Sequence, residues 1–232
     1  MSKLQFDEKT HTYKVDGVKY ASVTTVVKKW FQPFNAPVQA ARYAAKHGKT
    51  AKHWMKEWQK TAVFGTRIHS FAEKFLKERV FPKTSDQRER RFQEHIGRFV
   101  EKEIWGGFEV VFIEHKTFSE KHHLAGTVDL VLRDTESNGL LLADWKTNKQ
   151  IRQCNTWAAG FKELSHLDDC NYVHYSLQLN LYRALLNIEF PNSGYDTATM
   201  ALLHLTELKG VNIYKVFPME TEVASILKEL EC

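Results

Sequence analysis

Two carboxylates and one ammonium group near the middle of the sequence are the residues best suited to chemistry. Asp129 lies in the apolar run 125–133, and Asp144 ends a second apolar run, 139–144, two residues before Lys146. Burying two like charges beside an ammonium group is costly unless a cation completes the set. Hard divalent cations take oxygen ligands, so these side chains predict a Mg²⁺ or Mn²⁺ site, of one or two ions, with a lysine at its edge.

The segment between the two runs is polar and ends in Asn138-Gly139, which favours a β-hairpin. A hairpin places Asp129 beside Asp144, and the two-residue period of a strand puts Lys146 on the same face as Asp144. Cations held there would polarise a phosphodiester, and Lys146 would orient the attacking water or stabilise the developing negative charge. The alternative is a salt bridge at the rim of the sheet, which the apolar neighbours disfavour because unpaired charges are rarely buried.

Two further residues could complete this site. An amphipathic run follows Gly65-Thr66, so we expect a helix to begin there and to carry His69 in an early turn. A helical histidine is more often structural than a ligand, but neutral imidazole next to carboxylates is a good auxiliary metal ligand. Glu114, late in a strand predicted for 108–115, could reach the metal or its waters, or could face solvent.

A helix predicted for 172–190 carries Gln178 and Tyr182 on one face. The amide could hold a lysine or a metal-bound water, and the phenol could touch a phosphate. Without the other motifs, this pattern is that of an ordinary amphipathic helix. Thr147, directly after Lys146, could donate a hydrogen bond to the substrate backbone.

Basic residues are concentrated between Arg42 and Lys60, where six Lys or Arg residues face one acid, Glu57, a local charge of +5 that equals the charge of the whole chain. Such a block favours a polyanionic partner. Ammonium groups on phosphates and aromatic rings under bases would hold a single strand; a helix pair with core tryptophans and a charged outer face is an equally good interpretation. The candidate nucleic-acid-binding residues are Lys46, Lys49, Lys52, Trp54, Lys56 and Trp58.

Composition indicates a folded intracellular protein. The 232 residues are 43% hydrophobic with six tryptophans, enough for one large domain or a core with a helical appendage. No apolar stretch approaches the ~20 residues of a membrane span, and the polar start does not resemble a signal peptide. Cys154, Cys170 and Cys232 are widely spaced and odd in number, which argues against a disulfide framework and against a zinc or iron–sulfur site.

The pattern of elements predicts an α/β (mixed α+β) fold in which a central mixed β-sheet is flanked by helices. We expect two parts: residues 1–62, with a hairpin over 11–20, a helix starting at Ser22 and a basic helical region broken near Gly48, and residues 63–232, the core. The core is predicted to contain helices over 66–79, 86–104, 172–190 and 220–230, strands over 108–115, 125–133, 139–146, 197–205 and 211–217, and an irregular stretch over 148–171.

Together these residues resemble the PD-(D/E)xK nuclease superfamily, and more closely its RecB-like exonuclease branch. The matching elements, in the family's order, are Gly65-Thr66 with His69, Glu114, Gly126-Thr127-Val128-Asp129, Asp144-Trp145-Lys146-Thr147, and Gln178 with Tyr182. The segment from Gly17 to Thr25 is similar to the start of the mitochondrial genome maintenance exonuclease and of phage-encoded relatives. The last forty or so residues match only in their expected strands and helix.

The resemblance implies a restriction-endonuclease-like core and a Mg²⁺- or Mn²⁺-dependent DNA exonuclease acting on single-stranded DNA or DNA ends. It implies metal ligation by His69, Asp129, Asp144 and the carbonyl of Trp145, help from Glu114, action of Lys146 at the attacking water, and support of site and substrate by Gln178 and Tyr182. Some relatives hold an iron–sulfur cluster on four cysteines, a set that this chain lacks.

Two rival interpretations remain: a structure- or sequence-specific endonuclease on the same fold, and a non-catalytic nucleic-acid-binding module. In the mitochondrial relative a helical arch admits single strands, and residues 40–60 could act likewise. Protein partners, digestion polarity and the pathway, whether DNA repair, recombination or replication, are beyond the sequence.

Overall fold

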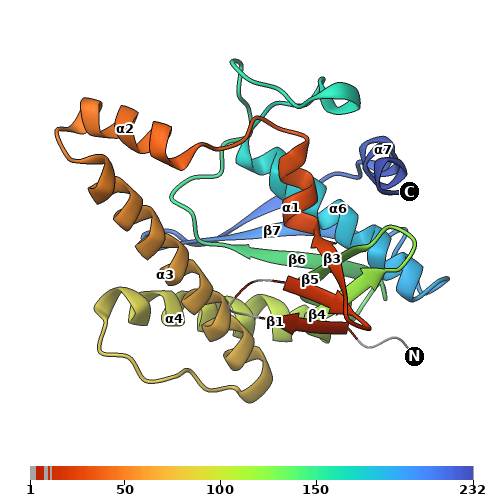
Figure 1. Cartoon of the computed structure of the whole chain (residues 1–232). Coiled ribbons are helices and arrows are strands. Elements are labelled where there is room, and N and C mark those ends of the chain that lie inside the picture. Colours follow the sequence, from red (N-terminus) through yellow and green to blue (C-terminus); the bar gives the residue numbers. More distant parts are fainter. Residues whose placement is uncertain (1–3, 8–9, 11, 232) are drawn as a thin grey trace.

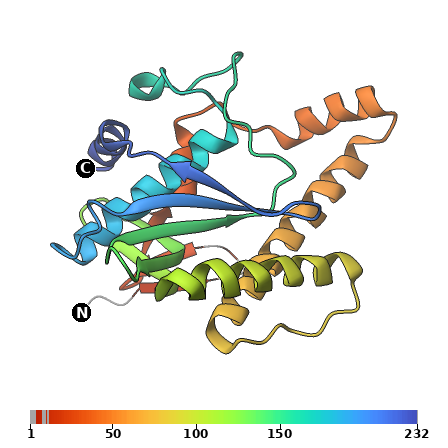
Figure 2. The same cartoon turned by 180° about the vertical axis from the view of Figure 1, so that it is seen from behind.

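The computed structural model describes residues 4–7, 10 and 12–231. Within them, eight strands form one sheet, and helices cover both of its faces (Figures 1 and 2). The strands are β1 (Leu4–Asp7), β2 (Thr12–Val15), β3 (Val18–Ser22), β4 (Phe108–Ser119), β5 (Leu124–Asp134), β6 (Leu140–Lys146), β7 (Thr199–Thr206) and β8 (Gly210–Val216). The helices and helical turns are α1 (Val23–Lys29), α2 (Ala36–His47), α3 (Ala51–Glu78), α4 (Gln87–Phe99), the π-helical turn η1 (Val100–Ile104), α5 (Trp105–Gly107), the 3-10 turn η2 (Lys162–Leu164), α6 (Asn171–Glu189) and α7 (Glu220–Leu230).

The sheet is mixed, and it forks at β5, where two strands pair with different parts of one edge of β5. Antiparallel pairing joins β1, β2 and β3, joins β4, β5 and β6, and joins β7 and β8; β3 runs parallel to β5, and β6 runs parallel to β7. One edge of β5 pairs with β4. The other edge pairs with β3 at Leu124 and Ala125 and with β6 from Leu130 onward. Residues 126–129 therefore lie where β3 and β6 part.

Two hydrophobic cores sandwich the sheet. On one face, Leu142 of β6 and Leu202 of β7 pack against α1, α6 and α7. On the other face, Ala143 and Trp145 of β6 and Leu203 of β7 pack against α3 and α4. This alternation follows from the two-residue period of a strand. It leaves Asp144 and Lys146 on the side of α6.

The predicted class, a mixed α/β fold with a central mixed sheet flanked by helices, is confirmed. The hairpin that ends at Lys146, the helices at 87–104, 171–189 and 220–230, and the last two strands lie close to their predicted ranges. Strand β1 was not expected. His11, at the start of the predicted first hairpin, lies outside the described residues.

The helix expected to begin at Gly65 was wrongly placed. Gly48 ends α2 in a left-handed conformation, and the Thr50 side chain caps α3 by accepting a hydrogen bond from the His53 amide. From there α3 continues unbroken to Glu78, so the sequence-based boundary at 62/63 falls inside a helix. The helix start was predicted at Gly65, but a glycine within a long helix lowers the stability of the helix without having to end it. None of the helices in the described part of the chain is long and apolar enough to cross a membrane.

Candidate active site

The fork in the sheet brings His69 of α3 to Asp129 of β5. Nδ1 of His69 lies 3.2 Å from Oδ2 of Asp129, and their side chains are 30% and 12% exposed. The same carboxylate oxygen accepts a hydrogen bond from the backbone amide of Trp145 at 3.0 Å. Since Leu130 pairs with Ala143 in the antiparallel ladder, Asp129 and Asp144 occupy the next opposed positions. The predicted neighbourhood of the two acids is therefore present.

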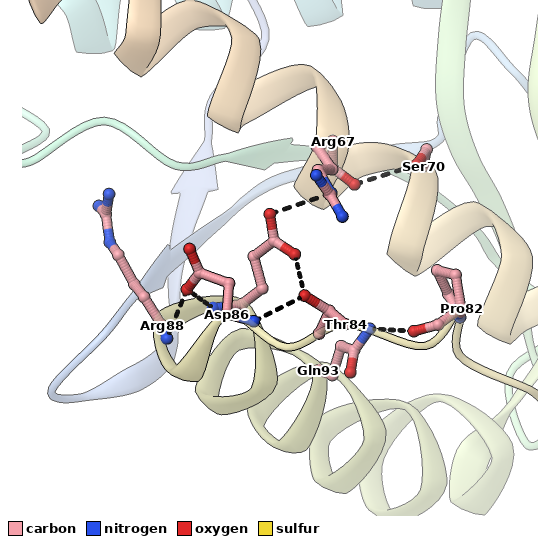
Figure 3. A network of polar contacts seen from close by, with 8 residues as sticks. Arg67, Ser70, Pro82, Thr84, Asp86, Arg88 and Gln93 are labelled. Carbon is pink, nitrogen blue, oxygen red and sulfur yellow. Dashed lines mark hydrogen bonds and ion pairs between the residues drawn. The ribbon is translucent and has the colours of Figure 1, made fainter.

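A polar network around the buried Glu89 holds α3 against α4, two residues from His69 (Figure 3). Glu89, 5% exposed at the start of α4, accepts from Nε of Arg67 at 3.0 Å and from Oγ1 of Thr84 at 2.5 Å. Asp86 caps α4 by accepting from the amides of Arg88 and Glu89. Charge-assisted hydrogen bonds to a buried acid are strong and directional. The network therefore fixes the helix that carries His69.

Glu114 of β4 completes a cluster with His69 and Asp129. Each of the three offers one ligand atom, and these atoms lie within 4.8 Å of one another. Glu114 has a left-handed φ of 52°, which is uncommon for a residue with a side chain and is a form of backbone strain that also occurs at active sites. The strand is distorted nearby, since its register against β5 shifts at Val111. The structure thus brings Glu114 to the site.

Lys146 is linked to α6 through a chain of polar contacts. Its Nζ lies 2.5 Å from Oδ2 of Asp144 and 3.4 Å from Oε1 of Gln178. Nε2 of Gln178 is 3.3 Å from Oδ1 of Asp144 and donates to the hydroxyl of Tyr182 at 3.0 Å. Nζ also lies 4.4 Å from the centre of the Tyr175 ring, a cation–π contact. These contacts orient both Asp144 and Lys146.

Burial and mutual charge shift the titration of these groups. Burial, together with the charge of Asp129, raises the pKa of Glu114 to about 8 against the lowering effect of His69. Burial raises the pKa of Asp144 to about 6 against the lowering effect of Lys146. For His69, burial favours a lower pKa, but the charge and hydrogen bond of Asp129 prevail and raise it. The protein alone thus gathers more negative charge than it can stabilise when every acid is ionised.

The donor set fits a hard divalent cation. Carboxylate oxygens and one imidazole nitrogen are ligands that Mg²⁺ and Mn²⁺ accept. Oδ2 of Asp144 is buried against the ammonium group of Lys146. The raised pKa values of Glu114 and Asp144 show that the described residues do not fully stabilise the charges of these acids, and a cation would. His69, Glu114, Asp129 and Asp144 are the side chains that could hold one.

Two glycines allow the elements of the site to approach one another. A Cβ on Gly126 of β5 would lie 2.4 Å from Cε1 of Tyr182 and 3.2 Å from Cγ2 of Val23. A Cβ on Gly65 of α3 would lie 3.0 Å from Oγ1 of Thr147. Gly65, in the middle of α3, therefore allows a close approach to the side chain of Thr147. Tyr182 is only 4% exposed, so its packing is that of a support for Gln178.

The basic block occupies α2 and the first half of α3, which lie together away from the sheet (Figure 1). Trp54 and Trp58 are half-buried and pack edge-on against Tyr43, with ring centres 5.3 and 5.8 Å from it. Lys46, Lys49, Lys52 and Lys56 are exposed. The tryptophans thus form the contact between the two helices, and the lysines face outward. This arrangement agrees with the interpretation of the block as a helix pair with a charged outer face.

Two tyrosines near the acids were not expected from the sequence. The hydroxyl of Tyr13 in β2 lies 2.9 Å from Oγ1 of Thr127. Burial raises the pKa of Tyr13, and the hydrogen bond with Thr127 opposes this rise. The charges of Glu114 and Asp129 raise the pKa further. Tyr175 carries the ring beneath Lys146. In the sequence, both tyrosines fit the pattern of ordinary core residues in amphipathic elements. No local feature of the sequence therefore identifies them as neighbours of the site.

Free thiols are present at Cys154, which is exposed, and Cys170, which is buried. Cys232 lies outside the described residues, so the structure describes two of the three cysteines in the sequence.

Comparison with known proteins agrees with this geometry. The model of the PD-(D/E)XK nuclease superfamily matches residues 40–231, and no curated protein matches the chain. Among solved structures, that of SSO0001 is 14% identical, with a TM-score of 0.37 over 90% of this chain and 74% of that one. A Eubacterium rectale protein provisionally named an exonuclease is 10% identical, with a TM-score of 0.40 over 91% and 77%. Both likenesses are too distant to carry an argument about function. The family match extends over most of the chain, which therefore belongs to the PD-(D/E)XK nuclease superfamily, nucleases that use divalent metals to cleave nucleic acid.

Proposed function

We propose that the protein is a Mg²⁺- or Mn²⁺-dependent deoxyribonuclease, and that it acts as an exonuclease on single-stranded DNA or DNA ends. The observation that carries the proposal is the convergence of His69, Glu114 and Asp129 within 4.8 Å, next to the Asp144–Lys146 pair. The imidazole comes from α3, the three acids come from three different strands, and the amine of Lys146 lies beside them. A salt bridge that served only stability would need one acid and one base, not this larger group of acids with an imidazole.

In this proposal His69, Asp129 and Asp144 hold the cation, with the carbonyl of Trp145 as a further ligand and Glu114 bound either directly or through a water. When bound, a divalent cation polarises the phosphodiester and lowers the pKa of a coordinated water. The Trp145 amide keeps Oδ2 of Asp129 in place, and Gln178 does the same for Oδ1 of Asp144.

Lys146 acts at the attacking water. The charges of Asp144 and Asp129 keep its ammonium group protonated, because they raise the pKa of Lys146 against the effect of burial. A charged donor in a partly dry site stabilises the negative charge that develops on the phosphate oxygens. Gln178 positions Lys146 and Asp144, and Tyr182, which is buried, supports Gln178 without reaching the substrate.

Residues 1–62 guide the strand in this proposal, and residues 63–232 form the nuclease core. The outward lysines Lys46, Lys49, Lys52 and Lys56 contact phosphates, while Trp54 and Trp58 hold the two helices together. Thr147 next to Lys146 donates to the substrate backbone. Because α3 carries both the basic residues and His69, a strand bound along it is led toward the cation.

End-labelled linear DNA and circular single-stranded DNA, incubated with Mg²⁺, Mn²⁺ or a chelator, test the proposal. We expect linear strands to be shortened stepwise with either metal, circles to stay intact, and the chelator to stop the reaction. Cleavage of circles would identify an endonuclease on the same fold. No cleavage with either metal, together with retained DNA binding, would identify a non-catalytic module.

A further inference from the structure

A cavity of about 490 Å³ lies directly beside the candidate active site, at the ends of the parallel strands β6 and β7. Thr147 lines it and follows Lys146 in the chain, so the two Cα atoms are about 3.8 Å apart. The other walls come from the loop after β6, from the β7–β8 hairpin and from the start of α4. Crevices at the carboxyl ends of parallel strands are common ligand sites, and this volume is in the usual range for them.

The walls of this cavity are held in place by contacts among themselves. Nε2 of His204 lies 2.6 Å from the carbonyl of Asn148, which joins the loop to β7. Glu207, in the hairpin turn, lies 3.3 Å from Nε of Arg88 and accepts from Nη1 of Arg91 at 2.8 Å. The ring of His95 meets the carbonyl of Glu207 at 3.1 Å. A site whose walls are fixed before binding loses less entropy when it binds.

Two polar side chains in the cavity walls are available to a ligand. No described residue makes a hydrogen bond to the side chains of Asn212 or Tyr214, and both are partly exposed in the cavity lining. A few accessible polar groups in a preformed cavity are what fix the orientation of a ligand.

The charges at the rim suit an anion. Lys149 and Lys209 are exposed, and neither has an ion-pair partner in the described part of the chain. The one acid of the lining, Glu207, is already neutralised by Arg88 and Arg91. The Tyr214 ring, 5.9 Å from that of His204, adds an aromatic surface. Two cations, an aromatic surface and amide groups are together the chemistry that recognises a nucleotide.

We propose that this cavity is a subsite for one nucleotide of the substrate strand, adjacent to the phosphodiester that is cleaved. The base lies against Tyr214 and exchanges hydrogen bonds with Asn212, and its phosphate lies between Lys149 and Lys209. This inference rests on the proposed nuclease function and adds to it the place where a flanking nucleotide is held.

Photo-crosslinking tests where the strand lies. Oligothymidylates with one thiothymidine at a time, bound to the protein in chelator, are irradiated, and the linked peptides are identified by mass spectrometry. We expect one or two adjacent positions of the strand to link to residues 147–151 or 204–214. A strand that binds and links only to other segments overturns the inference.

Affinity measurements test what the cavity recognises. For Lys149→Ala/Lys209→Ala, the slope of log Kd against log salt should fall by about 1.4, since each phosphate contact on a single strand contributes about 0.7. Asn212→Ala should weaken binding about fivefold through one lost hydrogen bond, with an unchanged salt slope. Lys14→Ala/Lys228→Ala, which removes two exposed lysines elsewhere, is the control and should change neither quantity.

The outcomes separate this inference from the proposed function. Effects of the lysine variants without any effect of Asn212→Ala and without a crosslink would mean that only the backbone passes over the cavity, which overturns a nucleotide subsite. Normal cleavage by all cavity variants overturns the inference and leaves the nuclease intact. Absence of cleavage by the wild-type protein with either metal overturns the proposed function, whichever segment the strand links to.

Discussion

Gly126 of β5 and Tyr182 of α6 are packed so closely that a Cβ at position 126 would lie 2.4 Å from the ring of the tyrosine. Tyr182 in turn receives a hydrogen bond from Gln178, which also reaches Asp144. The backbone of one strand therefore sets the position of a helix side chain that orients an acid on a second strand.

Gly126→Ala should displace Tyr182 and with it Gln178. We expect the free energy of unfolding to fall by about 1–3 kcal/mol, as for other overpacked cores, and nuclease activity to fall further than the folded fraction does. Chemical denaturation and initial rates measure the two effects. Gly106→Ala is the control, because a Cβ there meets nothing within 4 Å. Equal behaviour of the two variants would show that the close contact has no functional role.

Lys146→Ala should lower the rate of cleavage by about 10²-fold or more, the usual cost of removing one donor that stabilises transition-state charge. DNA affinity in chelator and Mn²⁺ binding should be largely retained, because the lysine contacts Asp144, Gln178 and Tyr175. Single-turnover cleavage and fluorescence anisotropy separate these effects. Lys83→Ala, at an exposed lysine, serves as the control. Full activity of Lys146→Ala with Mg²⁺ would refute its assigned role.

The metal-free protein should lose stability as the pH rises toward 8. The pKa of Glu114 is about 8 in the folded protein and near 4.5 in the unfolded chain, so the folded state binds the extra proton. The free energy of unfolding then falls as pH rises between these values, and Asp144 adds to the fall up to about pH 6. Tm measured in chelator against pH should show the decline, and Glu114→Gln should flatten it above about pH 6.

Glu109→Gln, an exposed acid on the same strand, should keep the pH dependence of the wild-type protein. A wild-type Tm that stays constant between about pH 6 and about pH 8 would contradict the burial of an unstable charge at Glu114.

Mn²⁺ should raise the Tm of the wild-type protein, because a cation that binds only the folded state stabilises it. His69→Ala and Asp129→Asn should each need at least about tenfold more Mn²⁺ for the same rise, since loss even of an outer partner of a metal ligand costs 10–100-fold in affinity. Glu78→Gln, at the end of α3 and paired with Lys74, should behave like the wild type. Identical titration curves for His69→Ala and the wild type would remove His69 from the site.

Glu89→Gln should loosen α3 from α4. The variant keeps the shape of the side chain but loses the charge that Arg67 and Thr84 contact, so we expect a loss of about 1–3 kcal/mol in unfolding free energy. Urea denaturation measures it. Glu94→Gln is matched on the same helix, since Glu94 is exposed and lies 4.0 Å from Arg98. A loss no larger than that of Glu94→Gln would mean that the network in Figure 3 does not stabilise the protein.

The sequence by itself determined the Asp129, Asp144 and Lys146 arrangement. A hairpin turn and the alternation of strand residues are local properties, so about twenty consecutive residues are enough to predict them. The order of strands and helices after residue 86 was predictable for the same reason. The position of Gln178 and Tyr182 on one helix face also follows from local spacing.

Only the tertiary structure decided several of the contacts around these three residues. The contacts of Tyr13 with Thr127, of Gly126 with Tyr182 and of Tyr175 with Lys146 join elements that no local pattern pairs. The length of α3 was likewise beyond local analysis, because packing against α4 and the sheet stabilises the helix through Gly65 against its weak propensity. Periodicity specifies the face of an element, whereas the packing of the whole chain specifies what that face touches.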